Sequence, residues 1–119
     1  MTHEHLFPLF LEMGMGVDLL GEDMTKAAQR AVREAINRTS LPGIGHLVPD
    51  GDRSHMRVDV TVAVPRPEEV DRDAVAAEFP YGTVTVTSVQ GGLRTPNGTD
   101  YGPGRDHLIV AVAVVAVGT

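Results

Sequence analysis

Hydrophobic residues alternate with polar residues along two segments of the chain, and this period of two predicts β-strands. From Val58 to Val64 valine occupies every second position, and Val84 and Val86 alternate with threonines. Two further segments are apolar almost throughout, which is typical of strands that are covered on both faces. The pattern therefore predicts four strands, at residues 6–13, 54–65, 83–89 and 106–117.

Apolar residues at spacings of three and four predict an amphipathic helix over residues 24–36, with Asp23 as its N-cap. The apolar side of this helix is mostly alanine, so the helix can lie close to a sheet. Residues 68–79 predict a shorter second helix. Gly14 and Gly16 precede the first helix and predict a turn between it and the first strand.

These elements follow one another in the order β-α-β-α-β-β, which indicates an α+β fold in a single domain over residues 1–119. Strands that are joined through a helix are expected to lie parallel, by right-handed crossovers. The last two strands can pair antiparallel across a long loop at residues 90–105. We therefore expect a mixed four-stranded sheet with both helices on one face.

The other face of this sheet is predicted to carry small and hydroxyl side chains. It would present Asp59, Thr61, Ala63, Thr83, Thr85 and Thr87, with alternate Ala and Val residues of the last strand. A solvated face usually carries Lys, Glu and Arg. The composition therefore predicts a homo-oligomer packed sheet to sheet, most simply a closed cyclic trimer. A threonine-rich face that is simply solvated is the alternative.

The chain is acidic, with 16 Asp and Glu residues against 10 Lys and Arg residues and a net charge of −6. This balance argues against nucleic acid as a partner, and no basic run is present that would bind a membrane surface. The longest apolar run, residues 108–117, is about half as long as a membrane-spanning helix. The chain has no cysteine and its first residues lack the pattern of a signal peptide, so a cytoplasmic location is expected.

Lys26 is the only lysine beside nine arginines, and it lies in the first turn of the predicted helix. A lysine retained in so arginine-rich a chain indicates a role as a compact point charge or a general base. A solvated position at the end of a helix is the alternative. The glycine-lined turn before this helix is a candidate site for an anion or a polar carbonyl, because free backbone N–H groups collect at a helix N-terminus.

One function open to these residues is that of a hydrolase or lyase acting on a small polar carbonyl or amide compound. Lys26 would take the proton of Ser88, which ends the third strand. The N–H groups of Gly91 and Gly92 would then stabilise the oxyanion. The candidate anchors for the substrate are Arg30 and Arg94.

The alternative function is that of a non-catalytic carrier or sensor for a small anion. Its pocket would be formed by Gly14, Gly16, Thr25 and Lys26, with Asp18 in the same stretch and Arg94 or Arg105 closing over it. The glycine spacing does not match a dinucleotide-binding loop, so no cofactor is expected. No metal site is assigned, because the candidate donors Asp18, Asp23, His46, His55 and His107 lack the spacing of paired ligands. Metal binding stays a third option, at a site that the fold or two subunits would have to assemble.

The segment from Glu12 to Ile36 reads EMGMGVDLLGEDMTKAAQRAVREAI, and SLPGI follows at residues 40–44. With these motifs the chain resembles, over essentially its whole length, a small bacterial family of conserved hypothetical proteins that was first catalogued in listerial genomes and has no assigned activity. The order of elements is also similar to that of trimeric chorismate mutases, reactive-intermediate deaminases and domains of ring-opening cyclic amide hydrolases. This likeness implies a chorismate-mutase-like fold with sites at subunit interfaces. It implies no activity, because fold alone does not carry function and nothing after His107 is charged, unlike in the deaminases.

Overall fold

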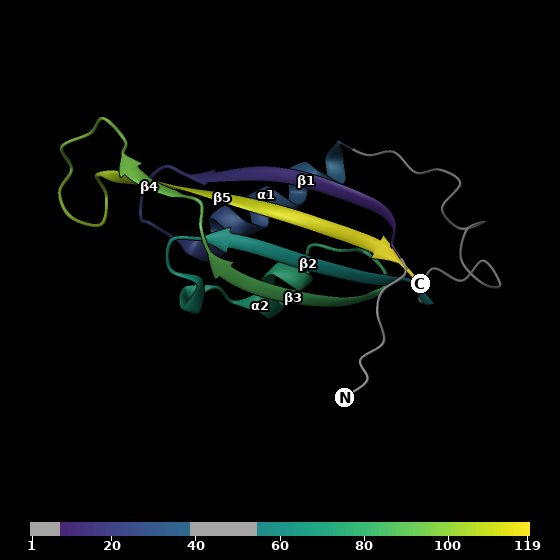
Figure 1. The fold of residues 1–119 in the computed structure, drawn as a ribbon. Coiled ribbons are helices and arrows are strands. Elements are labelled where there is room, and N and C mark those ends of the chain that lie inside the picture. The colour runs from purple at the N-terminus through teal and green to yellow at the C-terminus, as the bar shows by residue number, and fades with distance from the viewer. Residues whose placement is uncertain (1–7, 39–54) are drawn as a thin grey trace.

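The structure, a computed structural model, describes residues 8–38 and 55–119 (Figure 1). In chain order its elements are β1 (Pro8–Asp18), α1 (Met24–Asn37), β2 (Arg57–Val64), the 3-10 helix η4 (Pro67–Glu69), α2 (Arg72–Ala76), β3 (Thr83–Gln90), β4 (Leu93–Pro96) and β5 (His107–Gly118). The start of the first predicted strand, residues 6–7, and the candidate ligand His46 lie outside the described residues.

The strands form one mixed sheet in the order β1-β5-β2-β3, with β4 paired to β5. β5 runs antiparallel to β1, β2 and β4, whereas β2 and β3 are parallel neighbours. The three strands that precede or follow a helix therefore all run in one direction, as predicted. The α+β class and the order of elements are confirmed.

The pairing of the last strand differs from the expectation that it lies beside the third. β5 is inserted between β1 and β2, where both of its edges find a long partner. The pairing of β2 with β5 ends at Ala63 and Val112, which leaves the edge of β5 unpaired from Val110 back to His107. β4 fills that edge from within the segment predicted as a loop, so the sheet has a fifth strand.

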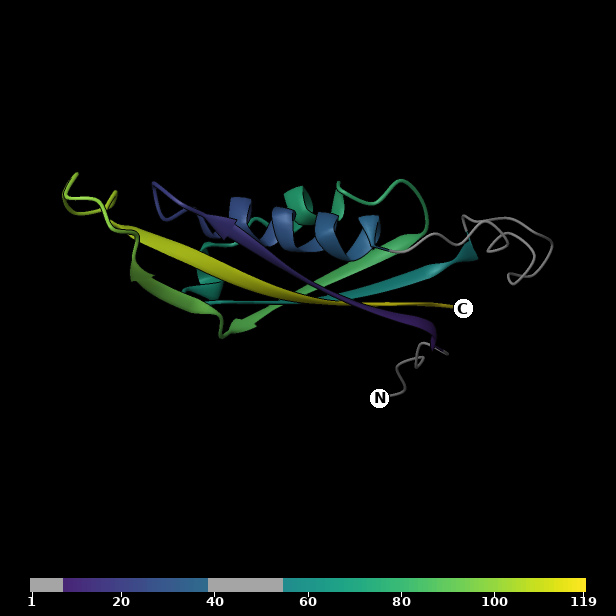
Figure 2. The same ribbon diagram turned by 90° about the horizontal axis from the view of Figure 1, so that it is seen from above.

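Both helices lie on the same face of the sheet, as Figure 2 shows. α1 packs over β1 and β5, and α2 packs over β3. The core between the layers consists of the valines of β2 that alternate with polar residues, the alanines of α1, and Ile109, Ala111, Ala113 and Val115 of β5. In the described part of the chain, no helix is long and apolar enough to cross a membrane.

Gly14 and Gly16 lie inside β1 and not in a turn, so this prediction is wrong. Both residues face the backbone of α1. A Cβ atom at Gly16 would lie 2.3 Å from the carbonyl oxygen of Ala27 and 2.3 Å from the nitrogen of Ala31. A Cβ atom at Gly14 would lie 2.3 Å from the carbonyl oxygen of Ala31. The glycines therefore allow the alanine side of the helix to approach the strand, and they do not open a loop.

The second predicted helix, residues 68–79, is divided into η4 and α2. Val70 has an extended backbone, with φ −77° and ψ 125°, and so ends η4. Asp71 then begins α2 by accepting a hydrogen bond from the nitrogen of Ala74 at 3.1 Å. A short side chain that caps a new helix here interrupts the longer one that the apolar spacing predicts.

The face of the sheet opposite the helices is not covered within the described residues, and we call it the open face. It includes the predicted Asp59, Thr61, Ala63, Thr83, Thr85 and Thr87 together with Leu11, Met13, Met15 and Val17 of β1, Val110, Val112, Val114 and Ala116 of β5, Val89 of β3 and Leu93 of β4. Because opposite residues of paired strands point to the same side, the register places all of them on one surface.

The contact between α1 and β1 is tested by Gly16→Ala. We expect this substitution to lower the free energy of unfolding by about 3 kcal/mol, because the new methyl group meets helix backbone that has no side chain to move aside. Denaturation with urea, followed by circular dichroism, measures the change.

Gly104→Ala is the matched control, because Gly104 has open space around it and a φ of 84°. It should lower the free energy of unfolding by only about 1 kcal/mol, because the left-handed backbone is its one source of strain. Equal losses in the two variants would contradict the close contact.

Candidate functional site

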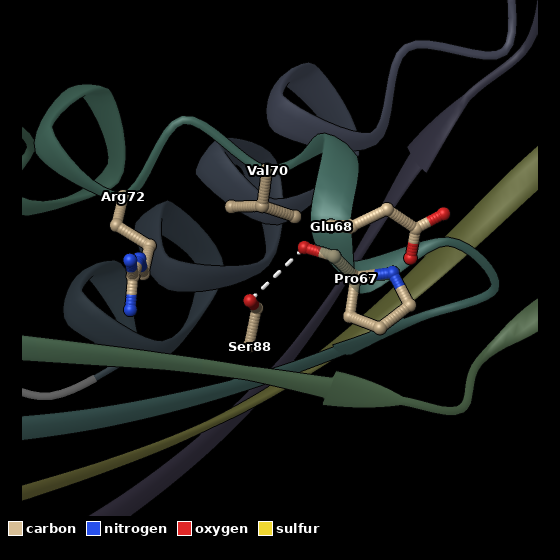
Figure 3. Close-up of a pocket in the computed structure, with 5 residues that line it drawn as sticks. All are labelled: Pro67, Glu68, Val70, Arg72 and Ser88. Atoms are coloured by element: carbon tan, nitrogen blue, oxygen red, sulfur yellow. Dashed lines mark hydrogen bonds between the residues drawn. The ribbon is translucent and has the colours of Figure 1, made fainter.

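A pocket with a volume of about 330 Å³ lies between the η4–α2 segment and β3 (Figure 3). It is lined by Pro67, Glu68, Val70, Arg72 and Ser88. The pocket is on the helix side of the sheet, near the carboxyl end of β3. The carboxyl ends of parallel strands are a common place for ligand sites in sheets with helical crossovers.

Ser88 points from β3 into this pocket, and its hydroxyl group donates a hydrogen bond to the carbonyl oxygen of Pro67 at 3.0 Å. The same carbonyl accepts the N–H of Val70 at 3.2 Å, which closes the turn of η4. Ser88 is therefore held in place by the wall of the pocket, and its oxygen still has lone pairs with which it can accept a hydrogen bond.

Arg72 is exposed at the start of α2 and makes no ion pair among the described residues. Figure 3 shows its guanidinium group on the opposite side of Ser88 from Glu68, whose carboxylate points away from the hydroxyl. The pocket thus combines one unpaired cation, one hydroxyl group and the apolar surface of Val70 and Pro67.

Thr25 of α1 positions the α2 wall of the pocket. Its hydroxyl oxygen accepts the N–H of Asp71 at 2.8 Å and donates to the carbonyl oxygen of Glu69 at 3.4 Å. Gln29, one turn further along α1, donates to the carbonyl oxygen of Ala74 at 3.2 Å. The sequence predicted Thr25 as a ligand-binding residue. In the structure it does not line the pocket but holds the η4–α2 segment that forms one of its walls.

Ser88 is the one predicted catalytic residue that lines the pocket. Lys26 is exposed on α1, and no contact joins it to Ser88 in the part of the chain that the structure describes. The N–H of Gly91 donates to the carbonyl oxygen of Val64 at 3.0 Å and is not free to hold an oxyanion. Gly92 lies next to β5, where a Cβ atom would be 2.1 Å from the carbonyl oxygen of Val110. Of the two predicted oxyanion donors, the N–H of Gly91 is thus already hydrogen-bonded, and Gly92 is packed against the backbone of β5.

Asp18 and Arg30 contact each other and the backbone near the end of β1. The buried carboxylate of Asp18 accepts the N–H of Asp23 at 2.9 Å and lies 3.5 Å from the guanidinium group of Arg30. Arg30 also donates to the carbonyl oxygen of Val17 at 2.7 Å. Asp23 itself caps α1 by accepting the N–H of Lys26 at 2.9 Å, which confirms the predicted N-cap. The side chains of Asp18, Asp23 and Arg30 thus order the turn into α1.

Glu22 is the centre of a second cluster that the sequence did not reveal. Arg94 of β4 binds it through both carboxylate oxygens, at 2.6 and 3.2 Å, and Arg66 approaches one of them at 3.2 Å. The hydrogen bonds from Arg94, more than those from Arg66, lower the pKa of Glu22 below its ordinary value of 4.5. Glu22 also has φ 48°, which is unusual for a residue with a side chain.

The Glu22 cluster includes a possible donor set for a metal, because ligand atoms of Glu22, Asp106 and His107 lie within 4.8 Å of one another. Both oxygens of Glu22 already accept hydrogen bonds from Arg94. The Nδ1 atom of His107 lies 2.8 Å from a carboxylate oxygen of Asp106. The arginines make this a structural ion-pair network that joins β4 to the end of β1, and the prediction of no metal stays a prediction.

Comparisons with known proteins agree with this fold. A family model described as a conserved hypothetical protein (Lin0512_fam) matches residues 8–117. The chain belongs to this family. The matched residues include the glycine-bearing strand β1 and the alanine-rich helix α1.

A crystal structure of an FtsZ-like protein of unknown function from Nostoc punctiforme PCC 73102 is similar to this Lin0512 family chain throughout. The two sequences are 37% identical, the match covers 94% of each chain, and the TM-score is 0.79. No curated protein matches the chain. The wider likeness to chorismate mutases and deaminases stays a prediction.

The ion pairs of Glu22 are tested by Glu22→Gln, which removes the charge and keeps the size of the side chain. Because the folded pKa of Glu22 is lowered, its contribution to stability is complete above the unfolded pKa and is lost as the pH falls through the folded pKa. The free energy of unfolding should therefore fall less in the variant than in the unmodified protein between about pH 6 and pH 3.

Glu68→Gln is the control for this measurement, since Glu68 is exposed and makes no ion pair within residues 8–38 and 55–119. Its pH dependence should match that of the unmodified chain. A Glu22→Gln protein with unchanged pH dependence would show that the two arginines do not stabilise the fold through this carboxylate.

Proposed function

We propose that this protein binds a small molecule with a carboxylate group in the Ser88 pocket and does not transform it. The observation that carries the proposal is the guanidinium group of Arg72, which has no acidic partner among the described residues and lines the same pocket as the Ser88 hydroxyl. A carboxylate is the group that a planar guanidinium binds best, through two parallel hydrogen bonds.

The size and lining of the pocket suit a small polar ligand. A volume of about 330 Å³ is at the lower end of the range for small-molecule sites. Val70 and Pro67 offer apolar contact, while Arg72 and Ser88 offer two polar groups that can orient the ligand. Glu68 lies on the far side of Ser88 from Arg72, so a ligand with a second negative charge would be repelled there. The arrangement favours a monocarboxylate whose other end is neutral or donates hydrogen bonds.

A binding role has more support than a hydrolase or lyase. The hydroxyl of Ser88 donates to a carbonyl oxygen, which cannot remove its proton as a general base would. Neither Lys26 nor the N–H of Gly91 contacts the serine in the described part of the chain. The carrier or sensor that the sequence left open is therefore the better proposal. The absence of nucleic-acid partners remains a prediction from the acidic composition of the chain, and a cytoplasmic location also remains a prediction.

Binding is tested by isothermal titration of the protein with acetate, lactate, malonate and phosphate. The two monocarboxylates should bind more tightly than malonate. Arg72→Gln should weaken lactate binding about tenfold or more, since it removes a charge-assisted pair, and Ser88→Ala should weaken it by a smaller factor.

Arg38→Gln is the matched control, because Arg38 is an exposed arginine at the end of α1, away from the pocket, and its loss should leave lactate binding unchanged. Equal weakening in both arginine variants would mean that charge alone attracts the anion. Hydrolysis of lactamide that is lost in Ser88→Ala would overturn the non-catalytic proposal and restore the hydrolase.

A further inference from the structure

The open face of the sheet is apolar over a continuous area, and its centre lies on β1 and β5. Met13 is opposite Val114 and Met15 is opposite Val112 in the β1–β5 pair. The second of these rows continues across the sheet through Ala63 to Val89 without a polar residue. Met13 and Met15 have 66% and 58% of their surface exposed, values typical of a position with no covering layer.

Seven of the ten large hydrophobic residues that are exposed in the described chain lie on this one face. Exposed hydrophobic residues that are scattered singly need no explanation, but a contiguous patch marks an interaction site. The predicted face of threonines occupies only the β2 and β3 side. Strand β1, which the sequence presented as apolar on both faces, supplies much of the rest through Leu11, Met13 and Met15, while Gly14 and Gly16 lie on its other side, against α1.

The size of the open face is close to what a stable association of two chains requires. Seven residues on each of four strands, at strand and residue spacings of about 4.8 and 3.4 Å, cover about 450 Å². Two such faces together would remove about 900 Å², which is close to the ~1,000 Å² that a specific interface should exceed.

The charges on the open face also fit a second copy of the chain. The chain as a whole carries a net charge of −6, so two copies repel each other over most of their surface. On the strand positions of the open face, by contrast, the charged residues are Arg57 and Asp59, one of each sign and two positions apart on β2. Two copies can therefore meet at this face without like charges being brought together.

From these observations we infer that a second copy of this chain covers the open face, with the two sheets packed face to face about 10 Å apart. Met13, Met15, Val112 and Val114 form the centre of the interface. The Ser88 pocket lies on the other side of the sheet, so association leaves it open to solvent. This inference does not rest on the proposed function, and a failure of either leaves the other in place.

Light scattering after size exclusion tests the association on the full chain. The unmodified protein should have a mass of two or more times 12.7 kDa, and Met13→Glu should reduce it to 12.7 kDa. Tyr101→Glu is the matched control, since Tyr101 has a similar exposed fraction, 62%, but lies in the segment between β4 and β5, and its mass should stay that of the unmodified protein. Circular dichroism establishes that each variant is folded.

A second measurement does not depend on disrupting the interface. The chain has no cysteine, so Thr83→Cys introduces a single thiol at the edge of the open face, away from its centre on β1 and β5, that can carry a spin label. Electron paramagnetic resonance should then give a distance between labels on two copies. A 12.7 kDa protein at millimolar concentration, or an oligomer that Met13→Glu leaves intact, would overturn the inference.

Discussion

Helix α1 lies against β1 with no layer of side chains from the strand between them, because Gly14 and Gly16 face the alanines of the helix. This backbone contact sets how close the helix approaches and therefore how the rest of the helical layer is placed. Thr25 at the start of α1 accepts the N–H of Asp71, and this contact depends on how close α1 lies to the sheet. The wall of the Ser88 pocket thus depends on two glycines in a strand that contributes nothing to its lining.

The same glycines account for the two-sided character of the sheet. On β1 the two positions that touch the backbone of α1 are glycines, and the large exposed side chains of that strand, Leu11, Met13 and Met15, are on the opposite face. Elsewhere the sheet buries its valines beneath the helices and turns threonines outward. The molecule therefore has a polar pocket on its covered side and an apolar surface on its open side. Each proposal uses one of these surfaces, and a ligand and a second chain would not compete.

The turn at Glu22 links the ends of the sheet. Arg94 from β4 and Arg66 from the end of β2 meet one carboxylate, which connects three segments that are far apart in the sequence. Asn97 adds a hydrogen bond of 2.7 Å to the carbonyl oxygen of Leu19. These contacts order the segment after β3, which the sequence predicts as a loop because of its composition. They also explain the left-handed backbone of Glu22, which aims its side chain between the two arginines.

The sequence by itself determined α1, the four long strands and their order along the chain, since alternation, helical spacing and the cap at Asp23 are local signals. It missed β4 and joined η4 and α2 into one helix. It also determined that one face of the sheet lacks the charges of a solvated surface. Only the tertiary structure decided the role of Gly14 and Gly16. The sequence does not distinguish a glycine that forms a turn from a glycine that lets a helix pack closely on a strand. The tertiary structure alone placed Arg72 and Ser88 at one pocket and Arg94 against Glu22, since each pair comes from separate elements whose distance depends on the packing of the whole sheet.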